Sequence, residues 1–189
     1  MTQIPGAARP TLVIGRGASD AGGAASLAAA RLRHAWALGP SPAPAADAAA
    51  GAEAALAGRL AAEGTPVLLL LAQAGRASHR MDLPLRVDPL PGSGGGAVLL
   101  VTVPAYASHA PQPAAAIRLI EAAARLLGGP GADRALHEDA EAWRRGADEL
   151  ATRDPRVAGL VREWEHRLEG ELPGGDEIAD GLTRLLDRA

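Results

Sequence analysis

Three short apolar runs stand out in the first two thirds of the chain. They occupy residues 11–15, 66–71 and 97–103, and each has the length of a buried strand. Continuous apolar runs of this kind are typical of strands covered on both faces, as in a parallel sheet. A weaker run at residues 83–87 contains Pro84, which favours an edge strand.

Segments with helical patterning separate these runs. Residues 21–36 are rich in Ala, residues 45–63 favour a helix that ends at Gly64, and Pro113 is well placed as the first residue of a helix that reaches residue 127. Strands that alternate with helices indicate an α/β layer. We therefore predict a three-layer α/β/α fold with a small, mainly parallel sheet over residues 1–131.

The pattern of apolar and charged residues changes after residue 131. Residues 132–189 are charged and helical in pattern, with Asp154 as a predicted N-cap and Pro155 at the first helical position. Two apolar stripes and a last amphipathic helix starting at Gly175 follow the helical period. The stripes consist of Leu136, Ala140, Trp143 and Ala147, and of Val157, Leu160, Val161, Trp164 and Leu168. We expect a helical C-terminal appendage that packs on the α/β domain or on a partner.

Composition narrows the possible functions. The chain has 189 residues, a net charge of −3, no Cys, no Lys and no Phe. The missing Cys excludes disulfides and thiolate chemistry, and the missing Lys excludes Schiff bases and Walker-type lysines. The absence of Lys, Asn and Phe, whose codons are rich in A and T, fits a genome of high G+C content. The charge gives no basis for nucleic-acid binding. No apolar run is long enough to cross a membrane and no secretory signal is visible, so we expect a cytoplasmic protein.

The first candidate site is the turn after the first strand. Gly15, Arg16, Gly17 and Ser19 precede a helix, and free N–H groups at a helix N-terminus favour an anion. Asp20 stands where a dinucleotide-binding motif would have Gly, and a carboxylate there repels phosphate. The alternative is a tight turn in which Ser19 or Asp20 caps the helix.

The second candidate site is a loop cluster of His79, Tyr106 and His109. His79 and His109 follow strands, so they could meet at one edge of the sheet. Solvated loop histidines are the commoner case. None of the five histidines forms an HxxxH or HExxH pair, so we expect no bound metal and no cofactor.

No catalytic residues are assigned. A serine hydrolase built from Ser19, Ser78 or Ser108 with His79 or His109 is conceivable, but the chain has no Gly-x-Ser-x-Gly turn. Acidic residues of the last third lie four positions from arginines, which favours surface ion pairs over catalytic carboxylates. The pairs are Glu141 with Arg145, Asp148 with Arg144, and Glu163 with Arg167.

Trp143 and Trp164 lie in the two apolar stripes of the last third. One interpretation is core packing between these helices and the sheet. The other is that they anchor an interface with a partner, because Trp is enriched at such positions.

The last third resembles bacterial members of the proteasome assembly chaperone 2 family. Val103-Pro-Ala-Tyr106 resembles that family's Val-Pro-His-Tyr segment, with Ala105 in place of His. Ser78-His79-Arg80 is similar to part of its Pro-His-Thr-Arg-Pro segment. The match is nearly continuous from Val103 onward and patchy before it, and the chain looks shorter than typical bacterial relatives. Further matching segments are residues 17–26, 84–87, 110–114, 140–143, 145–151, 154–158, 161–163 and 171–179.

This resemblance implies an α/β/α fold, a tendency to form homo-oligomers, and a protein partner related to the proteasome, because the eukaryotic family member helps to assemble proteasome α-rings. The chain ends Leu186-Asp-Arg-Ala189, without the hydrophobic-Tyr-X tail used there, so we do not expect docking through such a tail. The resulting hypothesis is a non-catalytic protein that acts through interaction and assembly.

A second, weaker resemblance concerns the first half. Residues 12–20 look like the opening strand and turn of sirohydrochlorin cobaltochelatases, and His79 with residues 82–84 is similar to their second metal-contacting segment. This resemblance implies an enzyme that inserts a divalent metal into a tetrapyrrole. Arg16 stands where the first metal-contacting His would be, and a guanidinium cannot bind a cation. The chelatase hypothesis also leaves the last third unexplained, so it ranks second.

Overall fold

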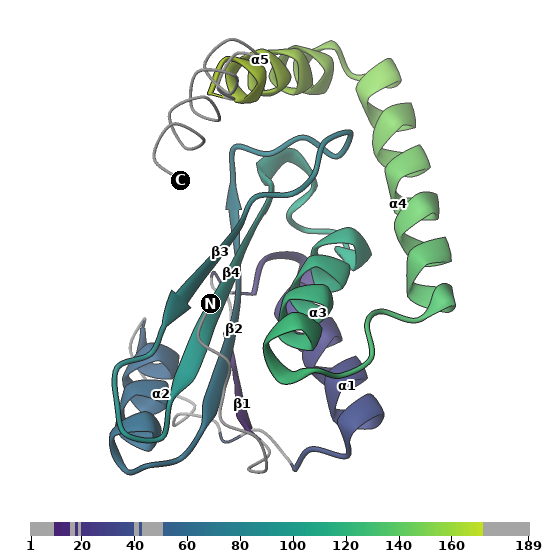
Figure 1. Cartoon of the computed structure of the whole chain (residues 1–189). Helices are drawn as coiled ribbons and strands as arrows, with labels where there is room; N and C mark the ends of the chain where they lie inside the picture. The colour runs from purple at the N-terminus through teal and green to yellow at the C-terminus, as the bar shows by residue number, and fades with distance from the viewer. Residues whose placement is uncertain (1–9, 16–17, 19, 40–41, 43–50, 172–189) are drawn as a thin grey trace, which may run out of the picture.

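A four-stranded mixed sheet forms the centre of the molecule (Figure 1). The computed structural model describes residues 10–15, 18, 20–39, 42 and 51–171, without the side chains of 168–171. In the sheet order β1-β2-β4-β3, the strands β1 (Thr11–Ile14), β2 (Val67–Gly75) and β4 (Gly96–Pro104) are parallel. The edge strand β3 (Leu85–Pro89) is antiparallel to β4.

Helices cover both faces of the sheet. The helices α1 (Ala24–Trp36) and α3 (Pro113–Leu127) lie on one face, and α2 (Ala52–Ala62) lies on the other (Figure 1). Short 3₁₀ turns, η2 (Ala21–Gly23) and η3 (Ala105–Ala107), follow β1 and β4. The predicted α/β/α fold with a mainly parallel sheet is confirmed. Residues 45–50 of the second predicted helix lie outside the described residues.

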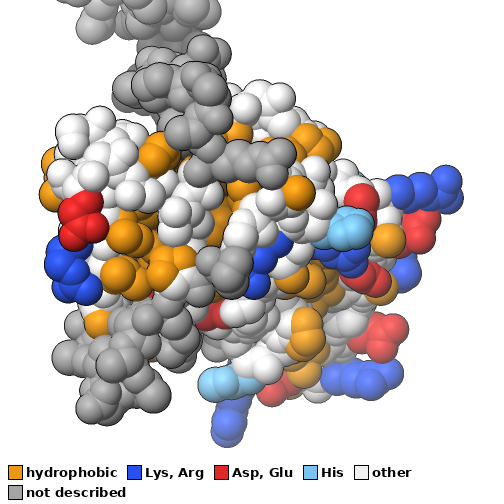
Figure 2. Space-filling model, turned by 90° about the horizontal axis from the view of Figure 1, so that it is seen from below, with side chains coloured by type: hydrophobic (Ala, Val, Ile, Leu, Met, Phe, Trp, Pro, Cys, Tyr) orange, Lys and Arg blue, Asp and Glu red, His pale blue; other side chains and the backbone are white. Residues whose placement is uncertain are grey.

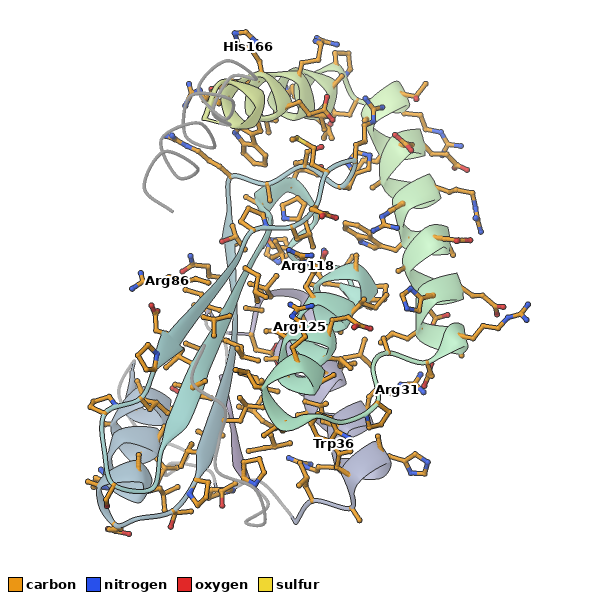
Figure 3. All side chains as sticks on the ribbon, in the orientation of Figure 1. Arg31, Trp36, Arg86, Arg118, Arg125 and His166 are labelled. Carbon is orange, nitrogen blue, oxygen red and sulfur yellow. The ribbon has the colours of Figure 1, made fainter. Side chains whose placement is uncertain are left out.

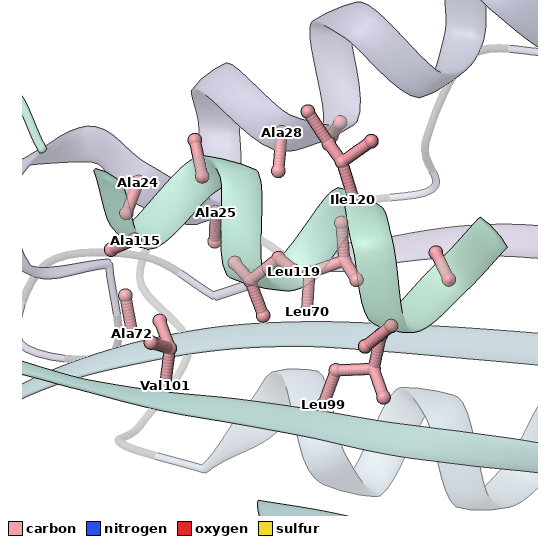
Figure 4. Close-up of a cluster of buried hydrophobic side chains, with 14 of the residues drawn as sticks. Ala24, Ala25, Ala28, Leu70, Ala72, Leu99, Val101, Ala115, Leu119 and Ile120 are labelled. Carbon is pink, nitrogen blue, oxygen red and sulfur yellow. The ribbon is translucent and has the colours of Figure 1, made fainter. Parts of the chain in front are cut away.

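The core explains why the apolar runs are continuous. In β2, Leu68 and Leu70 point into the layer of α1 and α3, whereas Val67 and Leu69 belong to the cluster under α2. Because neighbouring residues of a strand face opposite sides, burial of both faces requires an apolar residue at every position. The close-up in Figure 4 shows Leu70, Leu99 and Leu119 side by side between the sheet and α3.

Small side chains let the helices lie close to each other and to the sheet. The contacting surfaces of α1 and α3 are lined largely by alanines that are almost completely buried: Ala24, Ala25, Ala28, Ala29, Ala115, Ala116, Ala122 and Ala123. Alanine has no side-chain entropy to lose and favours helix, so an Ala-rich layer combines close packing with helix stability. The aromatic content of 2% is therefore no obstacle to a buried core.

Two long helices form an arm beside this layer. The helix α4 (Arg134–Arg153) begins at Asp133, whose carboxylate accepts from the Leu136 N–H at 2.8 Å, and Leu136 is buried in the main core. The helix α5 (Pro155–Glu171) begins after Asp154, which accepts from the Arg156 N–H at 2.9 Å. Both Asp154 and Pro155 have the predicted roles. The helix predicted from Gly175 lies outside the described residues.

The arm gives the molecule its outline. In Figure 1, α4 runs along the helical layer and α5 crosses above the end of the sheet where β2 and β4 stop. In the view from below, many of the visible charged side chains gather on the side of the molecule where α4 lies in Figure 1 (Figure 2). Within the described part of the chain, no helix is both long enough and apolar enough to cross a membrane.

The strand β2 is longer than the apolar pattern predicts. The pattern ends β2 at Leu71, but pairing with β4 continues to Gly75, although Gln73 and Ala74 are exposed. Ala72 is still fully buried, whereas at Gln73 and Ala74 backbone pairing with β4 extends the strand without side-chain burial.

Leu99→Ala tests the core. Leu99 is fully buried under α3, so we expect the substitution to lower the free energy of unfolding by about 2 to 5 kcal/mol, because it leaves a cavity. Urea denaturation measures this change. Leu150→Ala on α4, where the side chain is 41% exposed, is the matched control and should cost about 1 kcal/mol or less. Equal costs for the two substitutions would contradict this description of the core.

Candidate functional site

The chemically interesting side chains gather where the parallel strands end and the arm crosses them. Ser78, His79 and Arg80 come from the loop after β2, and Tyr106 comes from η3 after β4. The arm adds Asp148 from α4 and Glu165 from α5. We call these six residues, Ser78, His79, Arg80, Tyr106, Asp148 and Glu165, the His79 network.

Both ring nitrogens of His79 have a partner. Nδ1 lies 2.6 Å from the Tyr106 hydroxyl, and Nε2 lies 3.1 Å from Oδ1 of Asp148. An ionised carboxylate only accepts hydrogen bonds, so in the neutral ring Nε2 carries the hydrogen and Nδ1 accepts from the Tyr106 hydroxyl. The His79 backbone N–H also donates to the Tyr106 hydroxyl oxygen at 3.1 Å.

Aromatic side chains surround this imidazole. Tyr106 and Trp143 meet the His79 ring edge to face, with centroids 5.8 and 6.3 Å away, and Trp164 stacks on Tyr106 at 5.6 Å. The His79 side chain has no exposed surface at all. The ring is therefore held inside the protein, with its polar atoms used and its faces covered.

Further polar contacts connect the arm to the α/β layer. Arg80 Nε lies 2.7 Å from Oδ1 of Asp148, and the Ser78 hydroxyl donates to Oε1 of Glu165 at 2.8 Å. At the other end of α4, Arg31 and Asp133 form an ion pair at 2.9 Å. Both ends of α4 are thus fixed to the α/β layer, and α5 is fixed through Glu165 and the stacked rings.

The environment of the network shifts the pKa values of Asp148, Tyr106 and Arg80. The hydrogen bond from Arg80 lowers the pKa of Asp148, and the hydrogen bond from His79 lowers it further. Burial raises the pKa of Tyr106, so its hydroxyl stays protonated and able to donate at neutral pH. The hydrogen bond with Asp148 raises the pKa of Arg80. These shifts keep Asp148 ionised and Tyr106 and Arg80 protonated, which are the states that their hydrogen bonds require.

The structure brings together two of the three residues of the predicted loop cluster. His79 and Tyr106 are hydrogen-bonded, whereas His109 is exposed on the turn before α3 and takes no part in the His79 network. Within the described ranges, no three His, Cys, Asp or Glu side chains are placed to hold a metal ion together.

Ser78 and Ser108, the two described candidates for a serine hydrolase nucleophile, do not hydrogen-bond to a histidine. The Ser78 hydroxyl donates to Glu165, and the Ser108 hydroxyl donates to the carbonyl of Ala105 at 3.0 Å. Both nitrogens of His79 are occupied by Tyr106 and Asp148, so His79 has no atom left to act as a base toward serine. Ser19 lies outside the described residues.

The predicted anion site is the turn after β1, and there the carboxylate of Asp20 accepts from the first N–H groups of α1. The Gly15 N–H donates to the Leu70 carbonyl at 2.9 Å, and Asp20 Oδ1 accepts from the Ala25 N–H at 2.7 Å near the start of α1. The Asp20 carboxylate therefore accepts from free N–H groups in the first turn of α1, as one of the two sequence interpretations predicts, although Gly23 occupies the N-cap position. Arg16, Gly17 and Ser19 lie outside the described residues, so the anion site stays a prediction.

Sequence reasoning missed the acidic members of the His79 network. Asp148 pairs with Arg80 and His79, far away in the chain, and not with Arg144 as expected, whereas the predicted pair of Glu163 and Arg167 is present at 2.6 Å. Glu165 was not singled out. The only available signal was that each acid directly follows a residue of an apolar stripe, which places it beside the buried face of its helix.

Comparison with known proteins agrees with this fold. No protein-family model and no curated protein matches the chain. Among solved structures, a Corynebacterium glutamicum protein of unknown function is similar, with a TM-score of 0.66, 17% identity and coverage of 89% of this chain and 93% of that chain.

Two further similar structures carry a family name. One is a Mycobacterium tuberculosis proteasome-assembly chaperone homologue (17% identity), and the other is a PAC2 family protein from Streptomyces avermitilis (22% identity). Each has a TM-score of 0.59 and is covered completely by 81% of this chain. The predicted resemblance to the proteasome assembly chaperone 2 family is thus confirmed at the level of the fold.

Tyr106→Phe tests the His79 network. Loss of the hydroxyl leaves Nδ1 and the backbone N–H of His79 buried without a partner, which should lower the free energy of unfolding by about 1 to 3 kcal/mol. Hydrogen exchange should become faster in α5. Ser108→Ala, which removes a hydroxyl from the same turn, is the control and should leave exchange in α5 unchanged. Unaltered stability of Tyr106→Phe would refute the assigned hydrogen bonds.

Asp148→Asn tests the ionic part of the network through pH. Because the pKa of Asp148 is lower in the folded protein, its contribution to stability is present above its unfolded pKa of about 4 and is lost as the pH falls through the folded pKa. Asp148 is about half exposed, so solvent screening limits this contribution to roughly 1 kcal/mol or less.

Urea unfolding at a series of pH values between neutral and acidic, followed by Trp fluorescence, measures this effect. The decline in stability on acidification should be shallower in Asp148→Asn than in the wild-type protein. Glu149→Gln, at the neighbouring exposed position, is the matched control and should keep the wild-type slope. The same slope in all three proteins would rule out a stabilising role for the Asp148 carboxylate.

Proposed function

We propose that this protein is a non-catalytic, cytoplasmic protein of the assembly-chaperone type, which acts by binding a partner related to the proteasome. The observation that carries the proposal is the burial of His79. The most reactive side chain at the strand ends has no exposed surface and has both nitrogens occupied. The site where α/β proteins commonly bind small ligands is used here to hold the arm.

The arm offers a surface for such binding. Leu136 and Ala140 of α4 pack into the core with α3, and Val157 and Val161 of α5 pack beside Tyr106, whereas most charged residues of the two helices face outward. Fixing both ends of α4 gives this outer surface a defined shape before any partner arrives, which lowers the entropic cost of association. The fold shared with a proteasome-assembly chaperone homologue supports the choice of partner class.

The chelatase alternative gains no support from a specific contact. It requires an imidazole that reaches a metal ion at the strand ends. His79 is enclosed, and His109 takes no part in the His79 network. The proposed activity is therefore the binding of a partner through the protein surface.

Reconstitution of proteasome assembly tests the proposed function. The purified chain is mixed with separately purified α-type and β-type proteasome subunits, and native mass spectrometry follows the intermediates over time. We expect a complex of the chain with α-type subunits that appears before the finished particle, and peptidase activity that appears sooner than without the chain.

Tyr106→Phe and Ser108→Ala provide the matched pair for this assay. Loosening of the arm in Tyr106→Phe should reduce the amount of complex, and Ser108→Ala should behave like the wild-type protein. If the chain neither binds the subunits nor changes the rate at which activity appears, the proposed function is wrong.

A further inference from the structure

The strand β3 leaves one edge of the sheet open. It pairs with β4 on one side only, and the sheet order places no described strand on its other side. Val87 in the middle of β3 is 46% exposed, more than any other large hydrophobic residue among those described. Unpaired edges of this kind are templates for a further strand.

The pairing with β4 determines which backbone groups of β3 are free. The Thr102 N–H donates to the Pro84 carbonyl, and the Leu90 N–H donates to the Gly96 carbonyl. In an antiparallel ladder, bonded and non-bonded pairs alternate, so Arg86 and Asp88 also direct their backbone groups toward β4. Leu85, Val87 and Pro89 therefore direct theirs to the open edge.

The charges of β3 are arranged to match a reversed copy of the same strand. Arg86 and Asp88 flank Val87 and lie on one face, where they form an ion pair at 2.6 Å. Figure 3 shows Arg86 projecting away from α1 and α3. If two β3 strands run antiparallel with Val87 facing Val87, each Arg86 lies opposite the partner's Asp88. Registers centred on Arg86 or on Asp88 would place like charges opposite each other, which is destabilising.

We propose that two copies of this chain associate through their β3 edges, antiparallel and centred on Val87, so that their sheets join into one. In this register Val87 exchanges backbone hydrogen bonds with the partner's Val87, and the Leu85 N–H donates to the carbonyl of the partner's Pro89. The register that the charges favour is thus one that the free backbone groups allow. The interface has twofold symmetry and is closed, so it yields a dimer and not a fibre.

The ends of β3 limit the strength of this pairing. Pro89 has no N–H to donate at the open edge, so the ladder between copies ends there. Few hydrogen bonds and one apolar contact at the centre characterise a weak interface. We therefore expect a concentration-dependent monomer–dimer equilibrium.

Complementary charge reversals test the interface. Arg86→Asp makes β3 acidic and Asp88→Arg makes it basic, so each variant alone should dimerise at least about tenfold more weakly than the wild-type chain, because like charges then face each other. A 1:1 mixture of the two variants should recover dimers, each containing one copy of both. Analytical ultracentrifugation over a range of concentrations measures the association.

Further variants separate association from folding. Val87→Pro removes an N–H that points to the open edge while leaving the bonds to β4 intact, and it should abolish the dimer without loss of circular dichroism signal. Arg134→Asp disrupts an exposed ion pair on α4 and should leave the dimer unchanged. A chain that stays monomeric at every concentration would overturn the proposal. Dimers that persist in Arg86→Asp or in Val87→Pro, or a mixture that fails to recover them, would also overturn it.

Discussion

The enclosed imidazole of His79 is the constraint that joins the two parts of this molecule. A buried ring with two polar nitrogens is stable only if both find partners, because an unsatisfied buried polar group costs about 1 to 3 kcal/mol. One partner, Tyr106, comes from the α/β layer, and the other, Asp148, comes from the arm. The imidazole is satisfied only when α4 lies against the strand ends, so its burial and the position of the arm depend on each other.

This arrangement decides how the strand ends are used. In many α/β proteins the loops after parallel strands surround a ligand. Here the loops after β2 and β4 carry the residues that hold α4 and α5, and three aromatic rings pack around and beside the imidazole. The ends of β2 and β4 are therefore in contact with the arm. Among the described residues, the outer faces of the arm and the edge of the sheet at β3 are two surfaces that these contacts leave exposed.

The two open surfaces differ in physical character. The arm presents charged side chains on fixed helices, which suits recognition of a partner with complementary charge. The β3 edge presents backbone groups, one exposed Val and an Arg–Asp pair, which suits a copy of itself. In Figure 1, α4 lies on the side of the molecule away from β3, so a dimer joined through β3 would leave the outer face of α4 free for a different partner.

The amino-acid sequence by itself determined the local elements and the fold class. Continuous apolar runs such as residues 66–71, and helix-starting signals such as Pro113 and Asp154, report on the backbone and on burial within a few residues of themselves. The weak run at residues 83–87 likewise overlaps the edge strand β3. Only the tertiary structure decided that Asp148 contacts Arg80 and His79 instead of its neighbour Arg144. It also decided that His79 is buried whereas His109 is exposed. These pairings depend on contacts between segments about 70 residues apart in the chain. Arg144 and Arg80 can both form an ion pair with the Asp148 carboxylate, and only the packing of α4 against the loop after β2 brings Arg80 within reach.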